Sequence, residues 1–372
     1  MNVCIFLGAG ASAAENSPIQ NELFSEYFAS LKPKDFENDM NKELYRFFKQ
    51  MFKIDVMKDD MKNANFPTFE EVLGLIDLAE QRRESFKNFG LETLNRRSDS
   101  IRFLRQYLIL LMARAIHKSE GRRNEYHKML VDNLYDSNLL EKTTFISANY
   151  DIHIDNTIAA LYRRKKQPIM LDYGVDFNNF DVEGGWKKPT EPSVKLYKIH
   201  GSLNWLYCPI CNSLTLTPYE GGVMRLLDNI KEAKCLECKE VTVPIIIPPT
   251  FFKNMSNVFI STVWREVERT LRKCDVLVFC GYSFPDADIH IKYMLKRVQS
   301  SRKKPPLKII VFNNHEGKEE DSLLKEEDRY KRFLGSDVIY TRSSFQDFAK
   351  NPLKYIKINK LILYIIRLII KK

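Results

Sequence analysis

The sequence predicts an α/β fold, a doubly wound parallel sheet that carries a helical insertion and a small module built on four cysteines. Three observations support this prediction. Short apolar runs that end in Gly, Ser or Asn alternate with helix-like segments, as strands and helices do in a parallel sheet. A long segment in the first half has helical spacing throughout, and two Cys-x-x-Cys pairs lie in the second half. The sheet is therefore expected to be Rossmann-like, with a ligand along its carboxyl edge.

The composition is that of a folded chain with a large core. Of the 372 residues, 44% are hydrophobic, including 24 Phe and 17 Tyr, which excludes a disordered chain. This length suits one principal domain with one or two insertions. The 58 Lys and Arg against 48 Asp and Glu give a net charge of +10. The excess favours contact with polyanions such as nucleotides or nucleic acid, although a solvated basic surface explains it equally well.

The first expected strand ends in a glycine-rich turn. Val3–Leu7 is a short, continuous apolar run, and a glycine turn and a helix-like segment follow it. This order matches the G-x-G-x-x-A fingerprint, in which glycines let the backbone approach a pyrophosphate at a helix N-terminus. A glycine turn made only for packing is the alternative. The candidate cofactor-binding residues of the turn are Gly8, Ala9, Gly10, Ala11 and Ser12.

Residues 34–140 are predicted to form the helical insertion. Apolar residues recur there at spacings of three and four, for example at Phe69 and Val72, as on the buried face of a helix. The segment contains no catalytic constellation. Two isolated histidines, His117 and His127, are expected to have satisfied roles on the surface of helices.

Two polar side chains follow the next expected strand, Thr143–Ser147. Asn149 and Asp151 come directly after it and precede another helix-like stretch. Since open α/β sheets bind ligands at the carboxyl ends of their strands, both residues are candidates for a functional site. Capping of the following helix is the alternative role for an Asn or Asp at this place.

A histidine and a glycine end the alternating segment Val194–Ile199. Imidazole titrates near neutral pH and a following glycine leaves room for a substrate, so His200 before Gly201 is well placed to be a general base. A catalytic zinc ligand is the less favoured role for His200, because four cysteines nearby already complete a metal site.

The two Cys-x-x-Cys pairs are the strongest single chemical signal in the chain. Cys208 and Cys211 are separated from Cys235 and Cys238 by 23 residues. Four thiolates bind zinc tetrahedrally and leave no open position, so the predicted zinc is structural. Free or redox-active thiols are the alternative. Seven cysteines are an odd number for a disulfide framework, so a reducing, cytoplasmic setting is expected.

Two further buried strands are expected at Asp275–Cys280 and Leu307–Phe312. They run into Gly281-Tyr-Ser283 and into Asn313-Asn314. Because the carboxyl ends of parallel strands meet at one edge of a sheet, Gly281, Ser283 and Asn313 join the candidate binding residues.

The expected division of the chain follows these patterns. No stretch is apolar for long enough to span a bilayer. The tail is predicted to be a strand or an amphipathic helix that packs on the body or on a partner subunit, with membrane-surface binding as the alternative. The Rossmann-like domain is expected in three parts (1–33, 141–206 and 244–350), with the helical insertion at 34–140, the zinc module at 207–243 and the C-terminal packing or interaction segment at 351–372.

With these motifs in this order, the chain resembles the SIR2 (sirtuin) superfamily, and more closely its SIR2-like NADase branch in bacterial anti-phage defence, as in HerA–Sir2 systems. The resemblance covers the chain outside the helical insertion. The motifs that match are Gly8-Ala-Gly10-Ala-Ser12, Asn149 with Asp151, His200-Gly201, the two Cys-x-x-Cys pairs, Gly281-Tyr-Ser283 and Asn313-Asn314.

The resemblance implies an NAD-binding domain whose site cleaves NAD+. The residue corresponding to Asn149 orients the nicotinamide ribose and its attacking water, and His200 corresponds to the base that acts on a ribose hydroxyl. Asp151 would help to bind the nicotinamide end. The phosphates and the adenosine ribose would be held by Gly8, Gly10, Ser12, Gly281, Ser283 and Asn313.

Two departures from the family put acyl-lysine chemistry in doubt. The deacylases carry Pro-Asp-Phe-Arg soon after the glycine turn, whereas this chain has Ala14-Glu-Asn-Ser-Pro18-Ile-Gln20, and a compact deacylase has no large helical insertion. The expected function is an NAD+ glycohydrolase with NAD+ as substrate and zinc as structural metal. Its activity would be gated by assembly, as a homo-oligomer and with a HerA-like ATPase or, through the complex, nucleic acid. The alternatives are an NAD-dependent protein deacylase and a non-catalytic nucleotide-sensing scaffold.

Overall fold

A computed structural model describes most of the chain. The described residues are 1–58, 60–61, 63–86, 97–120, 124–179, 186–190, 192–217, 234–247, 257–303 and 305–357, with only the backbone at 97–100, 118–120 and 179. Residues 218–233 of the expected zinc module and 358–372 of the expected C-terminal segment lie outside this description.

The main sheet has seven strands in the order β11-β10-β9-β1-β2-β5-β3. All neighbouring strands are parallel. Every residue of β1, β2 and β9 is buried, because helices cover both faces of the sheet, as is usual for parallel sheets. The strands are β1 (Val3–Leu7), β2 (Thr143–Ser147), β3 (Leu171–Asp172), β5 (Val194–Lys198), β9 (Val276–Cys280), β10 (Lys308–Phe312) and β11 (Ile339–Tyr340).

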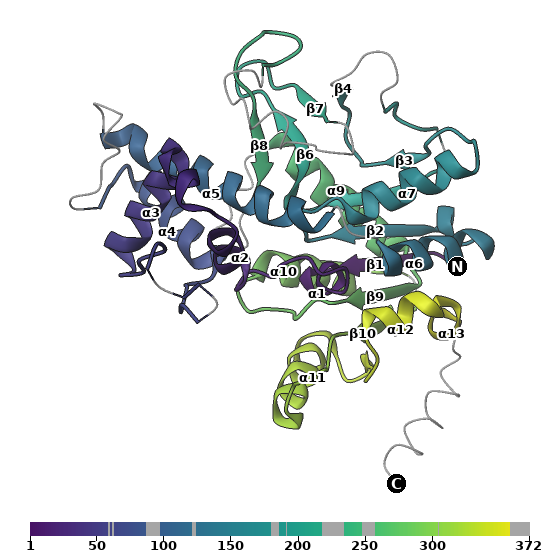
Figure 1. Cartoon of the computed structure of the whole chain (residues 1–372). Helices are drawn as coiled ribbons and strands as arrows, with labels where there is room; N and C mark the ends of the chain where they lie inside the picture. Colours follow the sequence, from purple (N-terminus) through teal and green to yellow (C-terminus); the bar gives the residue numbers. More distant parts are fainter. Residues whose placement is uncertain are drawn as a thin grey trace.

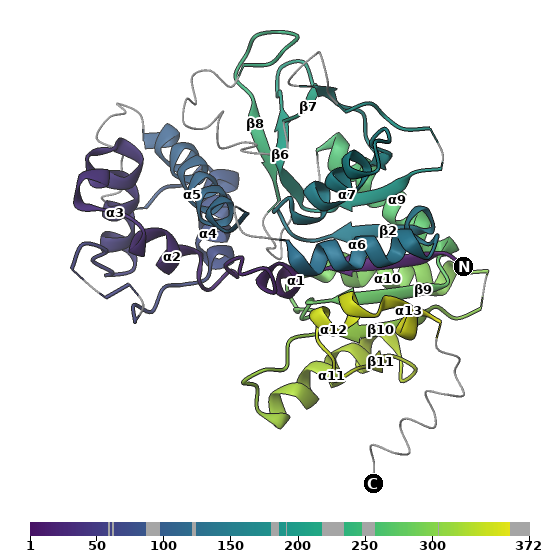
Figure 2. The ribbon, with the colours of Figure 1, turned by 45° about the vertical axis from the view of Figure 1, so that its right-hand side comes forward.

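The direction of strand addition reverses at β1. The chain adds β2 and β5 on one side of β1, and later adds β9, β10 and β11 on the other side. Right-handed crossovers therefore place the helices of the two halves on opposite faces, as Figure 2 shows for α6 and α10. One half contributes α6 (Glu125–Asp136) and α7 (His153–Arg164), and the other contributes α9 (Val258–Lys273), α10 (Ile289–Ser301) and α11 (Glu320–Leu334). This confirms the predicted doubly wound fold.

The last two described helices lie on the first of these faces. Helix α12 (Phe345–Lys350) and helix α13 (Pro352–Ile356) both pack against α6. The start of the expected C-terminal segment therefore packs on the body of the protein.

A second group of helices stands at the carboxyl edge of the main sheet, beside α1 (Ala9–Ala13) (Figure 1). We call it the helical unit. Its residues form a core cluster separate from that of the sheet, and a capping box at Thr68 and Glu71 begins α4. The unit consists of α2 (Leu23–Ala29), η1 (Pro33–Glu37), α3 (Asp39–Met51), α4 (Phe69–Arg82) and α5 (Arg97–Glu120).

A smaller sheet carries the strand that follows His200. Its order is β4-β7-β6-β8, so β8 is an edge strand. The strands are β4 (Asn178–Asn179), β6 (Gly201–Tyr207), β7 (Leu214–Leu216) and β8 (Val243–Ile246). Just before β2, the chain also forms a short 3₁₀ turn, η2 (Leu140–Lys142).

No helix in the described ranges is both long and apolar enough to cross a membrane.

Candidate functional site

Two glycine segments far apart in the sequence meet where the strand order reverses. The Gly8 N–H donates to Cys280 O at 2.9 Å, and the Gly10 N–H donates to Gly281 O at 2.8 Å. A Cβ on Gly281 would lie 2.1 Å from Ala11 N, and its φ of +63° is left-handed. Only glycine fits there. The turn therefore packs directly on the end of β9, at the switch point where such sheets bind ligands.

The predicted binding residues lie around this contact and differ in how exposed they are to solvent. In the turn, Ala9 is exposed, whereas Ala11 and Ser12 are buried. The Gly281 N–H donates to Phe312 O at 2.7 Å, which brings the ends of β9 and β10 together. Ser283 is exposed beside this junction, and Asn313 is buried next to Tyr340.

A cavity of about 600 Å³ adjoins two of these segments. Its lining includes Ala13, at the end of α1, and Asn314, after β10. The helical unit closes the other side with Tyr27 and Arg114.

Asn149, Ser12 and Asp151 form one hydrogen-bonded chain. The Ser12 hydroxyl donates to Asp151 Oδ2 at 2.6 Å. Asn149 Nδ2 donates to Ser12 Oγ at 2.7 Å and to Gly8 O at 2.9 Å. The glycine turn and the segment after β2 are thus joined by side chains as well as by neighbouring strands.

This chain fixes the orientation of the Asn149 amide. A carboxylate only accepts hydrogen bonds, so the Ser12 hydroxyl gives its single proton to Asp151. The Ser12 oxygen must then accept from Asn149, and Gly8 O is also an acceptor. Both facts turn Nδ2 toward the glycine turn and Oδ1 away from it. Within the described part of the chain, no donor reaches Asn149 Oδ1.

Asp151 stays ionised although it is buried. Burial raises the pKa of Asp151, but the nearby His153 and Lys198 and the hydrogen bond from Ser12 outweigh burial and lower it below the usual value. Asp151 Oδ1 also accepts from the His153 N–H at 3.2 Å. The carboxylate therefore points at Ser12 and at the start of α7.

A buried lysine lies under this segment. Lys198 Nζ donates to Asp151 O and lies 3.4 Å from Asp155 Oδ2, with both side chains fully buried. Asp155 Oδ1 accepts from the Tyr173 hydroxyl at 2.8 Å. The ammonium group of Lys198 compensates the negative charges of Asp151 and Asp155. Buried carboxylates that lack a positive partner would strongly destabilise the fold.

His200 lies at the junction of the two sheets. Its Nδ1 is 3.1 Å from Ala148 O, and a carbonyl oxygen accepts only. In the neutral imidazole the proton is therefore on Nδ1, and Nε2 keeps the basic lone pair. The side chain is 2% exposed, so Nε2 is shielded from bulk water. Gly201 has a φ of +83°, and a Cβ on it would lie 2.0 Å from Ile245 O.

Several residues of this region were missed by sequence reasoning. His127 was expected on a helix surface, but it is 1% exposed and its Nδ1 lies 3.0 Å from Glu15 Oε1. That prediction was wrong because the partner, Glu15, is 112 residues away. His117 is exposed, as predicted. Lys198 had a usable signal, since it follows Val194 and Leu196 at a spacing of two residues and so shares the apolar face of the alternating segment Val194–Ile199.

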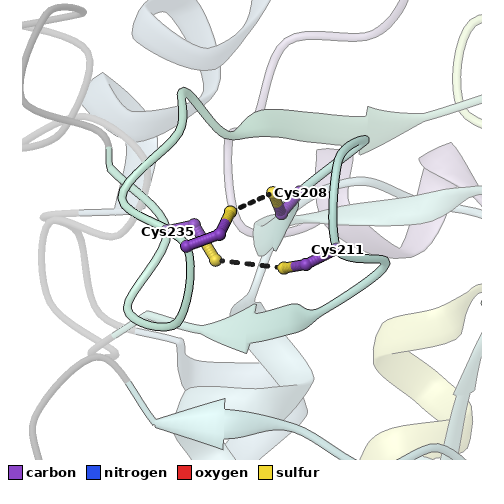
Figure 3. A group of neighbouring side chains, drawn as sticks. Cys208, Cys211 and Cys235 are labelled. Carbon is purple, nitrogen blue, oxygen red and sulfur yellow. Dashed lines mark hydrogen bonds between the residues drawn. The ribbon is translucent and has the colours of Figure 1, made fainter.

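The four predicted cysteine ligands come together at one end of the smaller sheet. The sulfurs lie within 4.8 Å of one another, with Cys208 Sγ 3.4 Å from Cys238 Sγ and Cys211 Sγ 3.5 Å from Cys235 Sγ (Figure 3). Four sulfurs at about 2.3 Å from a tetrahedral zinc ion would be about 3.8 Å apart. The donor set and its spacing therefore fit zinc, and all seven cysteines of the chain are free thiols.

Comparison with protein-family models gives one match, to the SIR2-like domain, over residues 143–339. This range is more than half of the chain. The chain belongs to the SIR2-like domain family. The range contains Asn149, Asp151, His200, the four cysteines, Gly281, Ser283 and Asn313, and it excludes the glycine turn.

Solved structures of sirtuins are similar to this chain at low identity. One, from work on the structural basis of sirtuin substrate affinity, is 15% identical over 96% of this chain and 94% of its own, with a TM-score of 0.39. Sir2 with the inhibitor EX-527, 2′-O-acetyl-ADP-ribose and a deacetylated p53 peptide is 14% identical over 96% and 95%, with a TM-score of 0.38. Sir2 with a p53 peptide and NAD+ is 13% identical over 96% and 94%, with a TM-score of 0.40.

These identities and scores are too low to transfer a residue of those proteins onto this chain. No curated protein matches the sequence.

Proposed function

We propose that this SIR2-like protein is an NAD+ glycohydrolase, which converts NAD+ and water to ADP-ribose and nicotinamide. The observation that carries the proposal is the orientation of Asn149. Its Nδ2 is held by Gly8 O and Ser12 Oγ, so its carbonyl oxygen is left to accept a hydrogen bond from water or from a ribose hydroxyl. Membership of a SIR2-like family supports NAD+ as the substrate.

The proposed reaction uses water as the nucleophile. The bond between ribose C1′ and the nicotinamide nitrogen breaks, and its electron pair stays with nicotinamide. Asn149 Oδ1 orients the water whose oxygen attaches to C1′. A proton leaves the water or the ribose hydroxyl for His200 Nε2, which carries the basic lone pair in the tautomer set by Ala148 O, and is then released to solvent.

The remaining predicted residues have supporting roles in this proposal. Asp151 holds Ser12 and, through it, Asn149. The residues proposed to bind the phosphates and the adenosine ribose are Gly8, Ala9, Gly10, Ala11, Gly281, Ser283 and Asn313. The four cysteines would hold a structural zinc and take no part in the chemistry.

The test is nicotinamide release from NAD+ by the purified protein, with Asn149→Ala and His200→Ala variants. Each variant should lower the rate at least about a hundredfold, because each removes a group that acts in the transition state. Matched controls are Asn63→Ala and His117→Ala, which change exposed residues of the same types and should leave the rate unchanged.

Three outcomes would contradict the proposal in different ways. Release that depends on an added acyl-lysine peptide would indicate a deacylase. NAD+ binding without release under any activating condition would indicate a nucleotide-sensing scaffold. Equal release by all variants would place the chemistry elsewhere.

The biological setting belongs to the same proposal. The predicted role is a cytoplasmic effector of anti-phage defence, gated by homo-oligomerisation and by a HerA-like ATPase or nucleic acid bound through the complex. These partners stay predictions. The mass of the native assembly, measured with and without a candidate ATPase, tests them directly.

A further inference from the structure

Tyr150 stands between Asn149 and Asp151, but the proposed chemistry does not use it. Its ring packs against the core cluster of the helical unit. The same ring is 6.5 Å from the His200 ring, centroid to centroid. Tyr150 therefore lies close to both the proposed base and the helical unit.

The polar atoms of Tyr150 hold the two strands next to His200. Its hydroxyl donates to Ile247 O at 2.8 Å, just beyond β8. Its carbonyl accepts from the Leu203 N–H of β6 at 3.0 Å. The Ile247 N–H in turn donates to His200 O at 2.9 Å. The hydroxyl of Tyr150 and the backbone of His200 are thus separated by a single residue, Ile247.

The hydroxyl is a permanent donor at neutral pH. Burial raises the pKa of Tyr150 well above its usual value, and the negative charges of Asp288, Glu70 and Asp77 raise it further. Glu70 and Asp77 belong to α4 of the helical unit. The phenol therefore keeps its proton for Ile247 O.

The helical unit also contacts the smaller sheet directly. Leu203 and Leu206 of β6 and Ile246 of β8 are part of its core cluster. Arg105 of α5 is paired with Asp77 at 2.7 Å, and its Nη2 is 3.5 Å from Ile246 O. Because β8 is an edge strand, no other strand in the described ranges fixes its position on that side.

We propose that Tyr150 is a positioning residue that couples the packing of the helical unit to His200, through Ile247. The part of this inference that concerns catalysis rests on the proposed function. A displacement of α4 and α5, for example by a bound partner, would move Tyr150 and β8 and so change the position of the base. Such a partner would control the reaction without touching NAD+.

The first test is a nuclear magnetic resonance measurement that needs no activity. In protein labelled with ¹⁵N-histidine, His200→Ala identifies the His200 signals, and the Nδ1–H bound to Ala148 O gives a slowly exchanging proton. Tyr150→Phe keeps the ring and removes the hydroxyl, and it should shift this signal or abolish its slow exchange. The matched control is Tyr207→Phe, whose hydroxyl donates to Asn212 Oδ1 at 2.6 Å at the far end of β6, and it should change nothing.

Unchanged His200 signals in Tyr150→Phe would overturn the positioning role, whether or not the protein cleaves NAD+. Arg105→Ala tests the link to the helical unit, since it should also shift the His200 signal. If the His200 signal shifted in Tyr150→Phe but not in Arg105→Ala, the link to the helical unit would be overturned and the positioning role of Tyr150 would stand.

The second test is kinetic and applies once nicotinamide release is measured. Tyr150→Phe should lower kcat by about tenfold, the loss expected for one structural hydrogen bond, and leave the KM for NAD+ within about twofold. An unchanged kcat would contradict the coupling. A large rise in KM with kcat unchanged would assign Tyr150 to substrate binding instead.

Discussion

At the scale of single residues, the candidate site depends on the charge of Asp151. An ionised carboxylate forces the Ser12 hydroxyl to donate to it, and this leaves the Ser12 oxygen able only to accept from Asn149. A proton on Asp151 would allow Ser12 to donate elsewhere, and Gly8 O alone would then hold Asn149 Nδ2 in place. The charge of Lys198 below Asp151 helps to prevent this.

Ser12→Ala tests this arrangement. The variant removes the acceptor that fixes Asn149 Nδ2 and leaves Asp151 without its hydroxyl partner. A hydrogen bond to a charged group contributes about 1.5–3 kcal/mol, so nicotinamide release should fall by roughly tenfold to a hundredfold. The control is Ser25→Ala, which removes an exposed hydroxyl bonded to Glu22 O. A rate for Ser12→Ala equal to that of the control would show that Ser12 does not orient Asn149.

At the scale of elements, Glu15, which follows α1, caps the N-terminus of α6. The Glu15 carboxylate accepts from the N–H groups of Glu125, Tyr126 and His127, at 2.9, 2.8 and 2.8 Å. These are the first residues of α6, whose own N-cap residue, Asn124, makes no capping bond with its side chain. A carboxylate is favourable there because the N-terminal N–H groups are unpaired and the helix dipole is positive.

Glu15→Gln should therefore reduce stability in a pH-dependent way. Burial raises the pKa of Glu15, but its bonds from His127 and Glu125 outweigh burial and lower it. A lowered pKa means that the charge stabilises the fold above the unfolded value of about 4.3. This contribution is lost as the pH falls through the lower folded pKa.

The measurement is urea unfolding at pH 7 and at steps below pH 4. The wild type should exceed Glu15→Gln by about 1–3 kcal/mol at pH 7, and the difference should shrink with acid. Glu22→Gln, at an exposed position, is the control and should differ by less than about 0.5 kcal/mol. If the difference in stability did not change with pH, the effect of Glu15→Gln would come from altered packing and not from the loss of the carboxylate charge.

The four-cysteine cluster is predicted to bind a zinc ion that stabilises the smaller sheet at β6, β7 and β8. We expect about one zinc ion per chain by mass spectrometry of the metal content, and its removal by a chelator should lower the thermal unfolding temperature. Cys208→Ser should lose the metal, and Cys274→Ala, which changes a buried thiol elsewhere, should retain it. Full thermal stability after complete removal of the metal would contradict a structural role.

At the scale of the whole molecule, two hydrophobic cores meet at the carboxyl edge of the main sheet. The sheet and its helices form the first, and the helical unit forms the second at the carboxyl edge. Leu203 and Leu206 of β6 and Ile246 of β8 belong to the second core, although Trp205 of β6 belongs to the first. The packing also places α2 with the helical unit and α6 with the sheet. We therefore expect a displacement of the helical unit to change the position of His200.

Sequence patterns predicted the parts whose physical cause is local. Continuous apolar runs predicted β1, β9 and β10, because strands buried on both faces must be largely apolar. Two-residue strands such as β3 and β11 are too short to carry a periodicity, so they could not be predicted. The cysteine spacing predicted the cluster because each pair is one tight turn.

By itself, the sequence determined the doubly wound sheet, the helical insertion, the four-cysteine cluster and the candidate residues at the strand ends. The tertiary structure alone decided how those residues act on one another. Ser12 and Asn149 are 137 residues apart, and Tyr150 and Ile247 are 97 apart, so no local pattern relates them. Only the folded chain shows that Asp151 orients Asn149 and that the helical unit reaches His200, because both effects depend on hydrogen bonds between distant segments.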